Sequence, residues 1–197
     1  VSIMGLADMM YMVGVRYGSE NGEDLASQVM EFITYHVIQE SVRLAKDRGA
    51  FPGIKGSIYD AEDFRWRVKK PLVRQLADLG RPKVDWQKVV VGLKKYGVRN
   101  AAQTTIAPSG AIATISGLEG YGCEPVFALS YVMRTHEGAE KEGKEWRELY
   151  YESKLFEVAL KRAGVKGKKR ERIFEQVRET GSCQGVEEVP EEIRKVF

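Results

Sequence analysis

The sequence has few of the residues that build metal and redox sites. Cys123 and Cys183 are the only cysteines and lie far apart without a C-x-x-C pair, and His36 and His136 are equally isolated. These numbers exclude a thiolate zinc site or a disulfide framework as an organising feature. We predict no metal site, and we interpret Cys123 as an inert buried thiol because no base is evident near it.

Long hydrophobic runs are also missing. Hydrophobic residues make up 43% of the 197 residues, but no uncharged apolar run approaches the ~20 residues that span a bilayer. The most apolar segment near the start, "SIMGLADMMYMVGV" (2–15), contains Asp8. It lacks the basic leader and the small-residue cleavage site of a signal peptide. We therefore expect a cytoplasmic protein with no membrane partner.

The sequence has little excess charge of either sign. The net charge of +3, from 31 basic and 28 acidic residues, is too small to indicate nucleic-acid binding by itself. Basic residues do cluster in "RWRVKK" (65–70) and "KGKKRER" (166–172). Acidic residues follow closely and no aromatic stacking platform accompanies them, so solvated helix faces are the favoured interpretation. A nucleic-acid or anion-binding surface is the alternative, and nucleic acid is not an expected partner.

Apolar residues recur at spacings of three and four over much of the chain, which is typical of amphipathic helices. The predicted helices cover residues 2–14, 21–48, 86–96, 147–163 and 168–180. Asp85 precedes the third of these, and Gly97 is placed to cap its C-terminal end. Asp60 is a further cap candidate, for a short helix interrupted near Pro71. The fold class we expect is mixed α/β and predominantly helical.

Candidate strands are few. "QTTIA" (103–107) and "EPVFALSYVMR" (124–134) have the β-branched and aromatic content of strands. The second does not alternate cleanly, which suggests that both of its faces are covered. Because an isolated strand is not a stable sheet, these strands either pair with each other or have partners outside the chain. We therefore interpret residues 1–197 as a single incomplete domain.

The stretch "TTIAPSGAIATISG" (104–117) carries no charge in a chain that is 30% charged. Pro108 would end a strand, Ser109 would cap a helix, and Gly110 would allow a ligand to approach the backbone. The amides of Gly110, Ala111 and Ile112 would then have no intrahelical partner and could hold a phosphate group. An ordinary strand-to-helix turn is the alternative. The stretch is neither a P-loop nor a G-x-G-x-x-G turn.

Several segments together resemble one family, the ribonucleotide reductase catalytic chain. "NAAQTTIAPSGAIATISGLEGYGCEPVFALSYVMR" (100–134) is similar to the family's N-x-x-x-T-T-I-A-P-T-G-[TS]-I-S followed by S-S-G-x-E-P-x-F-x-L-x-Y. "IMGLADMMYMVGVRYGSE" (3–20), "VMEFITYHVIQESVRLAKDRGAFP" (29–52) and "VPEEIRKVF" (189–197) resemble further family segments in colinear order. The likeness is closest to the adenosylcobalamin-dependent, class II form.

In that family the Pro-Thr-Gly turn and the helix after it bind the phosphates of the substrate. The resemblance therefore implies phosphate-binding roles for five consecutive residues: Pro108, Ser109, Gly110, Ala111 and Ile112. Ser109 keeps the hydroxyl of the family's threonine, whereas Ala111 and Ala113 replace hydroxyl-bearing residues. Backbone amides are thus the main phosphate contacts that the resemblance implies.

The resemblance implies a partial segment, with few strands, of a ten-stranded α/β barrel in an enzyme that makes deoxyribonucleotides for DNA synthesis. The complete enzyme would use a ribonucleotide substrate and adenosylcobalamin, with other segments of the reductase chain as partners. The family's N-x-C-x-E motif is not in this sequence, so we assign no catalytic residue. We expect the chain alone to be inactive and to bind no cofactor. A non-catalytic helical binding or assembly module is the alternative, and a homo-oligomer is left open.

Overall fold

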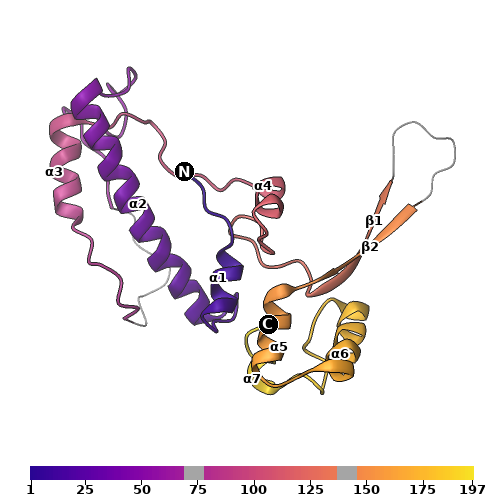
Figure 1. Ribbon diagram of the computed structural model, residues 1–197. Helices are drawn as coiled ribbons and strands as arrows, with labels where there is room; N and C mark the ends of the chain where they lie inside the picture. The colour runs from indigo at the N-terminus through magenta and orange to yellow at the C-terminus, as the bar shows by residue number, and fades with distance from the viewer. Residues whose placement is uncertain (69–77, 137–145) are drawn as a thin grey trace. The chain divides into compact units, whose positions relative to one another are not determined.

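The computed structural model describes residues 1–68, 78–136 and 146–197, in which helices outnumber strands (Figure 1). The elements are α1 (Leu6–Met12), α2 (Glu20–Arg48), α3 (Trp86–Tyr96), α4 (Gly110–Ile115), β1 (Ser130–His136), β2 (Trp146–Glu152), α5 (Lys154–Arg162), α6 (Gly167–Thr180) and α7 (Glu191–Arg194). The prediction of a mixed, predominantly helical chain is confirmed. The chain divides into two compact units, Val1–Ile3 with Gly18–Ala107 and Met4–Tyr17 with Pro108–Phe197.

Two helices, α2 and α3, lie side by side in the first unit (Figure 1). Their shared core includes Tyr35, Ile38, Val89 and Leu93. The C-terminal cap that the sequence predicts for α3 is present, because Gly97 follows the last turn with φ +68°. Asp85 is the N-cap and accepts a hydrogen bond from the Lys88 amide at 3.2 Å. Helix α2 begins at Glu20, one residue earlier than predicted, with Ser19 as its N-cap. The Ser19 side chain accepts from the Gly22 amide at 3.1 Å.

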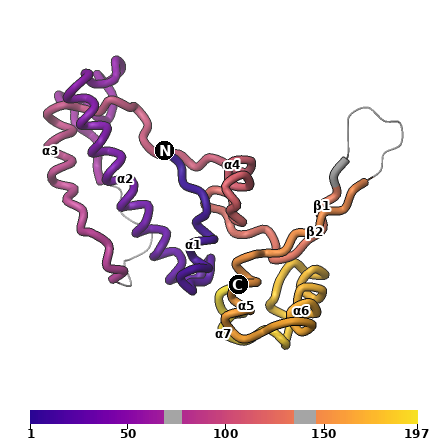
Figure 2. Tube along the Cα trace, viewed as in Figure 1, coloured from indigo at the N-terminus to yellow at the C-terminus, as the bar shows by residue number. Residues whose placement is uncertain are grey.

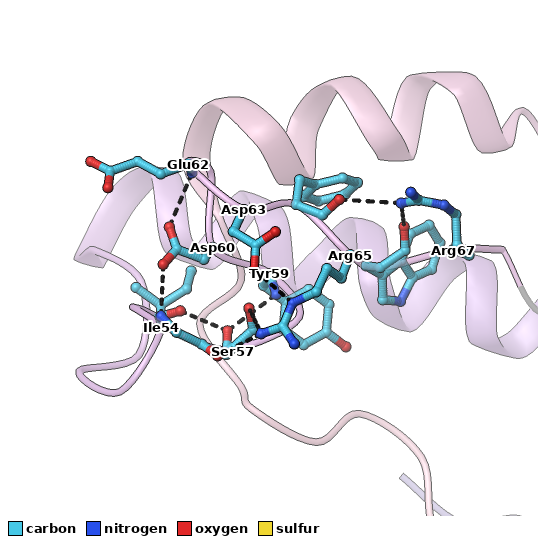
Figure 3. Close-up of polar contacts among 11 residues, drawn as sticks. Ile54, Ser57, Tyr59, Asp60, Glu62, Asp63, Arg65 and Arg67 are labelled. Carbon is cyan, nitrogen blue, oxygen red and sulfur yellow. Dashed lines mark hydrogen bonds and ion pairs between the residues drawn. The ribbon is translucent and has the colours of Figure 1, made fainter.

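The segment after α2 is a loop held by Asp60 (Figure 3). The Asp60 carboxylate accepts hydrogen bonds from the Gly56 amide at 2.6 Å and the Glu62 amide at 3.0 Å. These bonds hold the pKa of this carboxyl below its usual range. The prediction that Asp60 caps a short helix is therefore wrong for the described residues, which continue without a helix to Val68. Pro71, where we expected an interruption, lies outside the described residues.

Residues 103–107 do not form the predicted strand. They lie beside the first residues of the chain: the N-terminal ammonium of Val1 donates to the Gln103 carbonyl at 2.8 Å, and the Thr105 amide donates to the Val1 carbonyl at 3.0 Å. The Ala107 amide then donates to the Ser2 hydroxyl at 3.1 Å. A strand requires a continuing ladder, and this pairing stops too soon to make one.

In the second unit, α5, α6 and α7 enclose an apolar core (Figure 2). Its fully buried side chains include Phe156, Leu160, Ile173 and Val177. The chain ends in the same core, where the Phe197 ring lies 5.4 Å from that of Phe156. The predicted helix 168–180 is confirmed as α6.

Helix α1 is shorter than the predicted helix 2–14 and belongs to the second unit. Gly5, with φ +75°, precedes it. Because this segment lacks a polar face, its sequence predicts burial. Leu6 and Met10 are buried, but Met12 and Val13 at its end are exposed, so that expectation is only half right.

A two-stranded antiparallel ribbon of β1 and β2 lies between α4 and α5 in the sequence. Its register runs from Ser130 opposite Glu152 to His136 opposite Trp146. Residues 147–152 are thus strand, where we predicted helix, and the predicted strand 124–134 begins only at Ser130. The expectation that both faces are covered is also wrong, because Val132 and Met133 are exposed.

None of the helices in the described parts of the chain is long and apolar enough to cross a membrane. The cytoplasmic location expected from the sequence stays a prediction.

Candidate functional site

The turn before α4 has an unusual backbone at Ser109. Among the described residues Ser109 is the one non-glycine residue with positive φ, at φ 52° and ψ 10°. A side chain in this left-handed region costs of order 1 kcal/mol and persists only where the surroundings enforce it. The candidate site therefore contains a locally strained residue, a feature that clusters at functional sites.

Ser109 occupies the N-cap position of α4, but its side chain does not cap the helix. Side-chain capping requires an extended backbone at the cap residue, and the left-handed conformation points the hydroxyl elsewhere. The prediction of a capping hydroxyl is wrong for this reason. The first helical hydrogen bond runs from the Ala113 amide to the Ser109 carbonyl at 2.8 Å. The amides of Gly110, Ala111 and Ile112 precede it and have no intrahelical acceptor.

The first turn of α4 is open to solvent on one side and packed on the other. Ala111 is exposed, and the Ile112 side chain is 62% exposed, whereas Ala113 is fully buried. Tyr121 lies against the helix start, since a Cβ added to Gly110 would be 3.7 Å from the Tyr121 ring. The five residues that the sequence singles out are therefore contiguous and accessible at the start of α4.

A buried carboxylate from α1 fixes the segment that follows α4. Asp8 is 3% exposed and accepts hydrogen bonds from the amides of Glu119 at 2.8 Å and Gly120 at 2.7 Å. Gly120 has no room for a side chain, because a Cβ there would lie 3.0 Å from the Asp8 carboxylate and 3.1 Å from Ala7. The two hydrogen bonds tie α1 to Glu119 and Gly120, which follow the turn at the end of α4.

The same segment also caps α5. One oxygen of the Glu119 carboxylate accepts from the Ser153 hydroxyl at 2.6 Å, and the other accepts from the Leu155 amide at 3.0 Å. The Ser153 hydroxyl in turn accepts from the Phe156 amide at 3.0 Å. Asp8 and Glu119 thus form a relay of hydrogen bonds from α1 to α5, which sequence reasoning missed. The one available signal was the single charge of Asp8 within an apolar segment.

The two cysteines have different surroundings. Cys183 is fully buried in the core of the second unit, and burial raises the pKa of its thiol to about 11. Cys123 is half-buried rather than buried, and its carbonyl accepts from the Tyr17 hydroxyl at 2.7 Å. Within the described ranges, no group of three His, Cys, Asp or Glu side chains could hold a metal ion.

Cys183 should make the chain less stable in alkali. Its pKa rises on folding from the ordinary value of 9.0 to about 11, so the folded chain holds the thiol proton more tightly than the unfolded chain. The stabilisation is complete below about pH 9 and is lost as the pH rises towards about 11. Urea unfolding across this range should therefore show a falling free energy, with a smaller fall in Cys183→Ala. Equal slopes in the two proteins would refute this assignment.

The basic run 166–172 lies mainly on α6, and both of its arginines are ion-paired. Arg170 contacts Glu157 at 3.5 Å, and Arg172 contacts Glu188 at 3.1 Å. The hydrogen bond from Arg172 is the main cause that lowers the pKa of Glu188. Cations that are already paired with carboxylates bind a phosphate backbone less strongly. These contacts therefore favour the interpretation of the run as a solvated helix face.

Comparison with known proteins gives one consistent family. The family model described as "Ribonucleotide reductase, barrel domain" matches residues 1–197. A vitamin B12-dependent ribonucleoside-diphosphate reductase of Thermoplasma acidophilum is 30% identical over the whole chain, which covers 20% of that relative. A protein of the same description from Mycobacterium tuberculosis is 26% identical over the whole chain and 22% of its own length.

A third relative, a ribonucleoside-diphosphate reductase subunit alpha of Chlamydia muridarum, is 28% identical over 67% of this chain and 13% of its own length. The chain thus spans about a fifth or less of these relatives. Because the family model covers every residue, the chain belongs to the ribonucleotide reductase barrel-domain family.

Proposed function

We propose that this chain supplies the substrate-phosphate turn of a ribonucleotide reductase, which converts ribonucleotides to deoxyribonucleotides for DNA synthesis. The observation that carries the proposal is the accessible turn Pro108–Ile112, at the place where the family pattern has its phosphate-binding Pro-Thr-Gly. The relatives that match the whole chain are named as ribonucleoside-diphosphate reductases. Pro108, Ser109, Gly110, Ala111 and Ile112 are the proposed phosphate-binding residues.

Backbone amides are the donors that this turn offers to a phosphate. The amides of Gly110, Ala111 and Ile112 come before the first helical hydrogen bond, so each can donate to an anion at the helix start. Ala111 has no side chain beyond Cβ to shield them, and the absence of a side chain on Gly110 permits close approach. The strained Ser109 sets the direction in which these amides point.

Substitutions at Ala111 test this proposal without disturbing the fold, because the side chain is exposed. Aspartate in the first turn stabilises a helix but repels a phosphate. Ala111→Asp should therefore keep stability and weaken binding of cytidine diphosphate at least ~10-fold, because two like unit charges about 4 Å apart near a protein surface repel by about 4 kcal/mol. Ala111→Ser should strengthen binding, because it adds a hydroxyl donor. Isothermal titration calorimetry measures both.

Cytidine without phosphate is the matched control ligand. The proposed turn recognises the phosphate, so cytidine should bind far more weakly than its diphosphate to the unmodified chain. Equal binding of the two ligands, or unchanged diphosphate affinity in Ala111→Asp, would sink the proposal.

The wider reductase role rests on chain that this sequence does not contain. We propose that the chain forms part of a ten-stranded α/β barrel, with the remaining reductase segments as partners, and that the complete enzyme uses adenosylcobalamin. Two relatives that are named as vitamin B12-dependent reductases support this cofactor. Nothing in the described residues identifies a cobalamin site. The chain's own residues bind and orient the substrate's phosphate.

The chain alone should produce no deoxyribonucleotide, because the sequence contains no N-x-C-x-E radical motif. Mixing it with the remaining reductase segments and cobalamin should restore product, measured by chromatography. A stable complex without product would favour the alternative of a non-catalytic assembly module. Turnover by the chain alone would overturn the assignment of the chemistry to other segments.

A further inference from the structure

The first unit contains a cavity of about 500 Å³ that the proposed phosphate turn does not use. One wall is a face of α2, where Met30, Thr34 and Ile38 recur at helical spacing. The other walls come from the loop 58–67, from the start of α3, and from residues 102–104. The volume lies in the range of about 300–1,000 Å³ that is typical of small-molecule sites.

Three aromatic side chains give this cavity fixed walls. Tyr59 and Trp66 are 6% and 8% exposed, so packing holds both rings in place. Trp86 meets the Tyr35 ring edge-on at a centroid distance of 5.4 Å. The Trp66 and Trp86 rings are 6.2 Å apart and tilted by 42°. Pre-positioned aromatic faces bind flat apolar ligands at little entropic cost.

The side-chain oxygens of Glu31 and Gln103 on the cavity wall already accept hydrogen bonds. The Glu31 carboxylate accepts from the Trp86 indole at 3.0 Å and also pairs with Arg81. The side-chain oxygen of Gln103 accepts from the Tyr59 hydroxyl at 2.9 Å, and its amide nitrogen donates to the Asn100 carbonyl at 2.6 Å. A ligand that arrives with donors would find these acceptors occupied.

Donors remain, and one of them is charged. Arg67 uses one guanidinium nitrogen to donate to the carbonyls of Phe64 at 3.2 Å and Trp66 at 2.9 Å (Figure 3). In the part of the chain that the structure describes, no carboxylate forms an ion pair with Arg67. Arg65, in contrast, is already paired with Asp63 at 3.0 Å. The backbone carbonyls orient the Arg67 guanidinium but leave its charge uncompensated.

We propose that this cavity binds a planar aromatic anion, a flat ring system that carries one carboxylate or similar acceptor group. The ring lies among Tyr59, Trp66 and Trp86, and the anionic group accepts hydrogen bonds from Arg67. The combination of aromatic walls, occupied acceptors and an unpaired guanidinium selects this class over cationic or donor-rich ligands. The site is separate from the phosphate turn, and its occupancy does not depend on the proposed reductase role.

The full 197-residue chain is tested with 2-naphthoate as the probe and the neutral 2-naphthamide as its isostere, both by isothermal titration calorimetry. Naphthoate should bind saturably and about tenfold more tightly than naphthamide, because a charge-assisted hydrogen bond is worth roughly that factor. Arg67→Gln should reduce the naphthoate affinity to that of naphthamide. Arg67 is exposed, so this change should not affect folding.

Two further variants control for location. Ala102→Trp places a large side chain at an exposed position on the cavity wall and should block both probes. Arg134→Gln removes an exposed guanidinium from β1 in the other unit and should change neither affinity. The proposal is overturned if naphthoate does not bind, if Arg67→Gln binds it as tightly as the unmodified chain, or if Ala102→Trp leaves binding intact.

Discussion

Asp8→Ala is expected to lower the free energy of unfolding of the second unit by ~3 kcal/mol. The Asp8 carboxylate is buried and accepts from the amides of Glu119 and Gly120. Each hydrogen bond to a charged group contributes about 1.5–3 kcal/mol, and its loss leaves a buried amide unsatisfied. Asp8→Asn should recover little, because its side-chain amide offers one acceptor and turns a donor towards the second amide.

Two measurements check this expectation. Urea unfolding followed by circular dichroism gives the free energy, and hydrogen exchange gives the protection of the Glu119 and Gly120 amides. Glu191→Ala is the matched control, because it removes an exposed carboxylate whose partner, Lys195, is equally exposed. The control should behave like the unmodified chain. If Asp8→Ala matches the control and both amides stay protected, Asp8 does not hold this segment.

Loss of Asp8 should also affect the candidate site. The segment that Asp8 holds follows α4 directly and includes Tyr121, which packs against Gly110. If Asp8 is lost, Tyr121 loses its anchor to α1, and the start of α4 loses one of its packing contacts. We therefore expect Asp8→Ala to weaken cytidine diphosphate binding, although Asp8 is not one of the residues of the exposed turn.

Local signals explain which parts of the fold could be predicted from the sequence. The bounds of α3 follow from Asp85, Gly97 and the apolar face between them, because capping and periodicity act over a few residues. The long helix α2 could be predicted from the sequence in the same way. Each of these elements carries its own start and stop signals.

Strands could not be predicted as well, because their stability depends on a partner. "QTTIA" (103–107) has strand-forming residues but only a short contact with Val1 and Ser2, so no ladder forms. Residues 147–152 carry apolar residues that fit a helix pattern, yet pairing with β1 makes them a strand. Pairing overrides propensity in both segments.

In the candidate site, too, local features could be predicted from the sequence, whereas contacts between distant residues could not. The sequence places Pro108–Ile112 at a helix start, and the structure confirms that α4 begins at Gly110. The sequence does not reveal the left-handed backbone of Ser109, which removes the expected side-chain cap. Nor does the sequence reveal that Asp8 holds the segment after α4, or that Glu119 in this segment caps α5, because those contacts join residues far apart in the chain.

Phe156→Ala is expected to destabilise the second unit by about 3–5 kcal/mol, the usual cost of emptying a large buried aromatic site. Phe156 is fully buried, with the Phe174 ring 5.6 Å away and edge-on and the Phe197 ring 5.4 Å away. Phe156→Leu keeps most of the volume and should cost about 1 kcal/mol. Phe127→Ala is the matched control, because Phe127 is 87% exposed. Its effect should stay within about 0.5 kcal/mol.

A double-mutant cycle links this core to the Asp8 relay. Phe156 donates its amide to Ser153, which donates its hydroxyl to Glu119, whose own amide donates to Asp8. Phe156→Ala keeps the backbone amide that bonds Ser153, so the cycle pairs Asp8→Ala with Ser153→Ala instead. Because Ser153 and Asp8 both bond Glu119, the two losses should combine to less than their sum by roughly 1 kcal/mol. Urea unfolding of the four proteins measures this coupling. Strict additivity would show that the hydrogen-bond relay transmits no stability from α1 to α5.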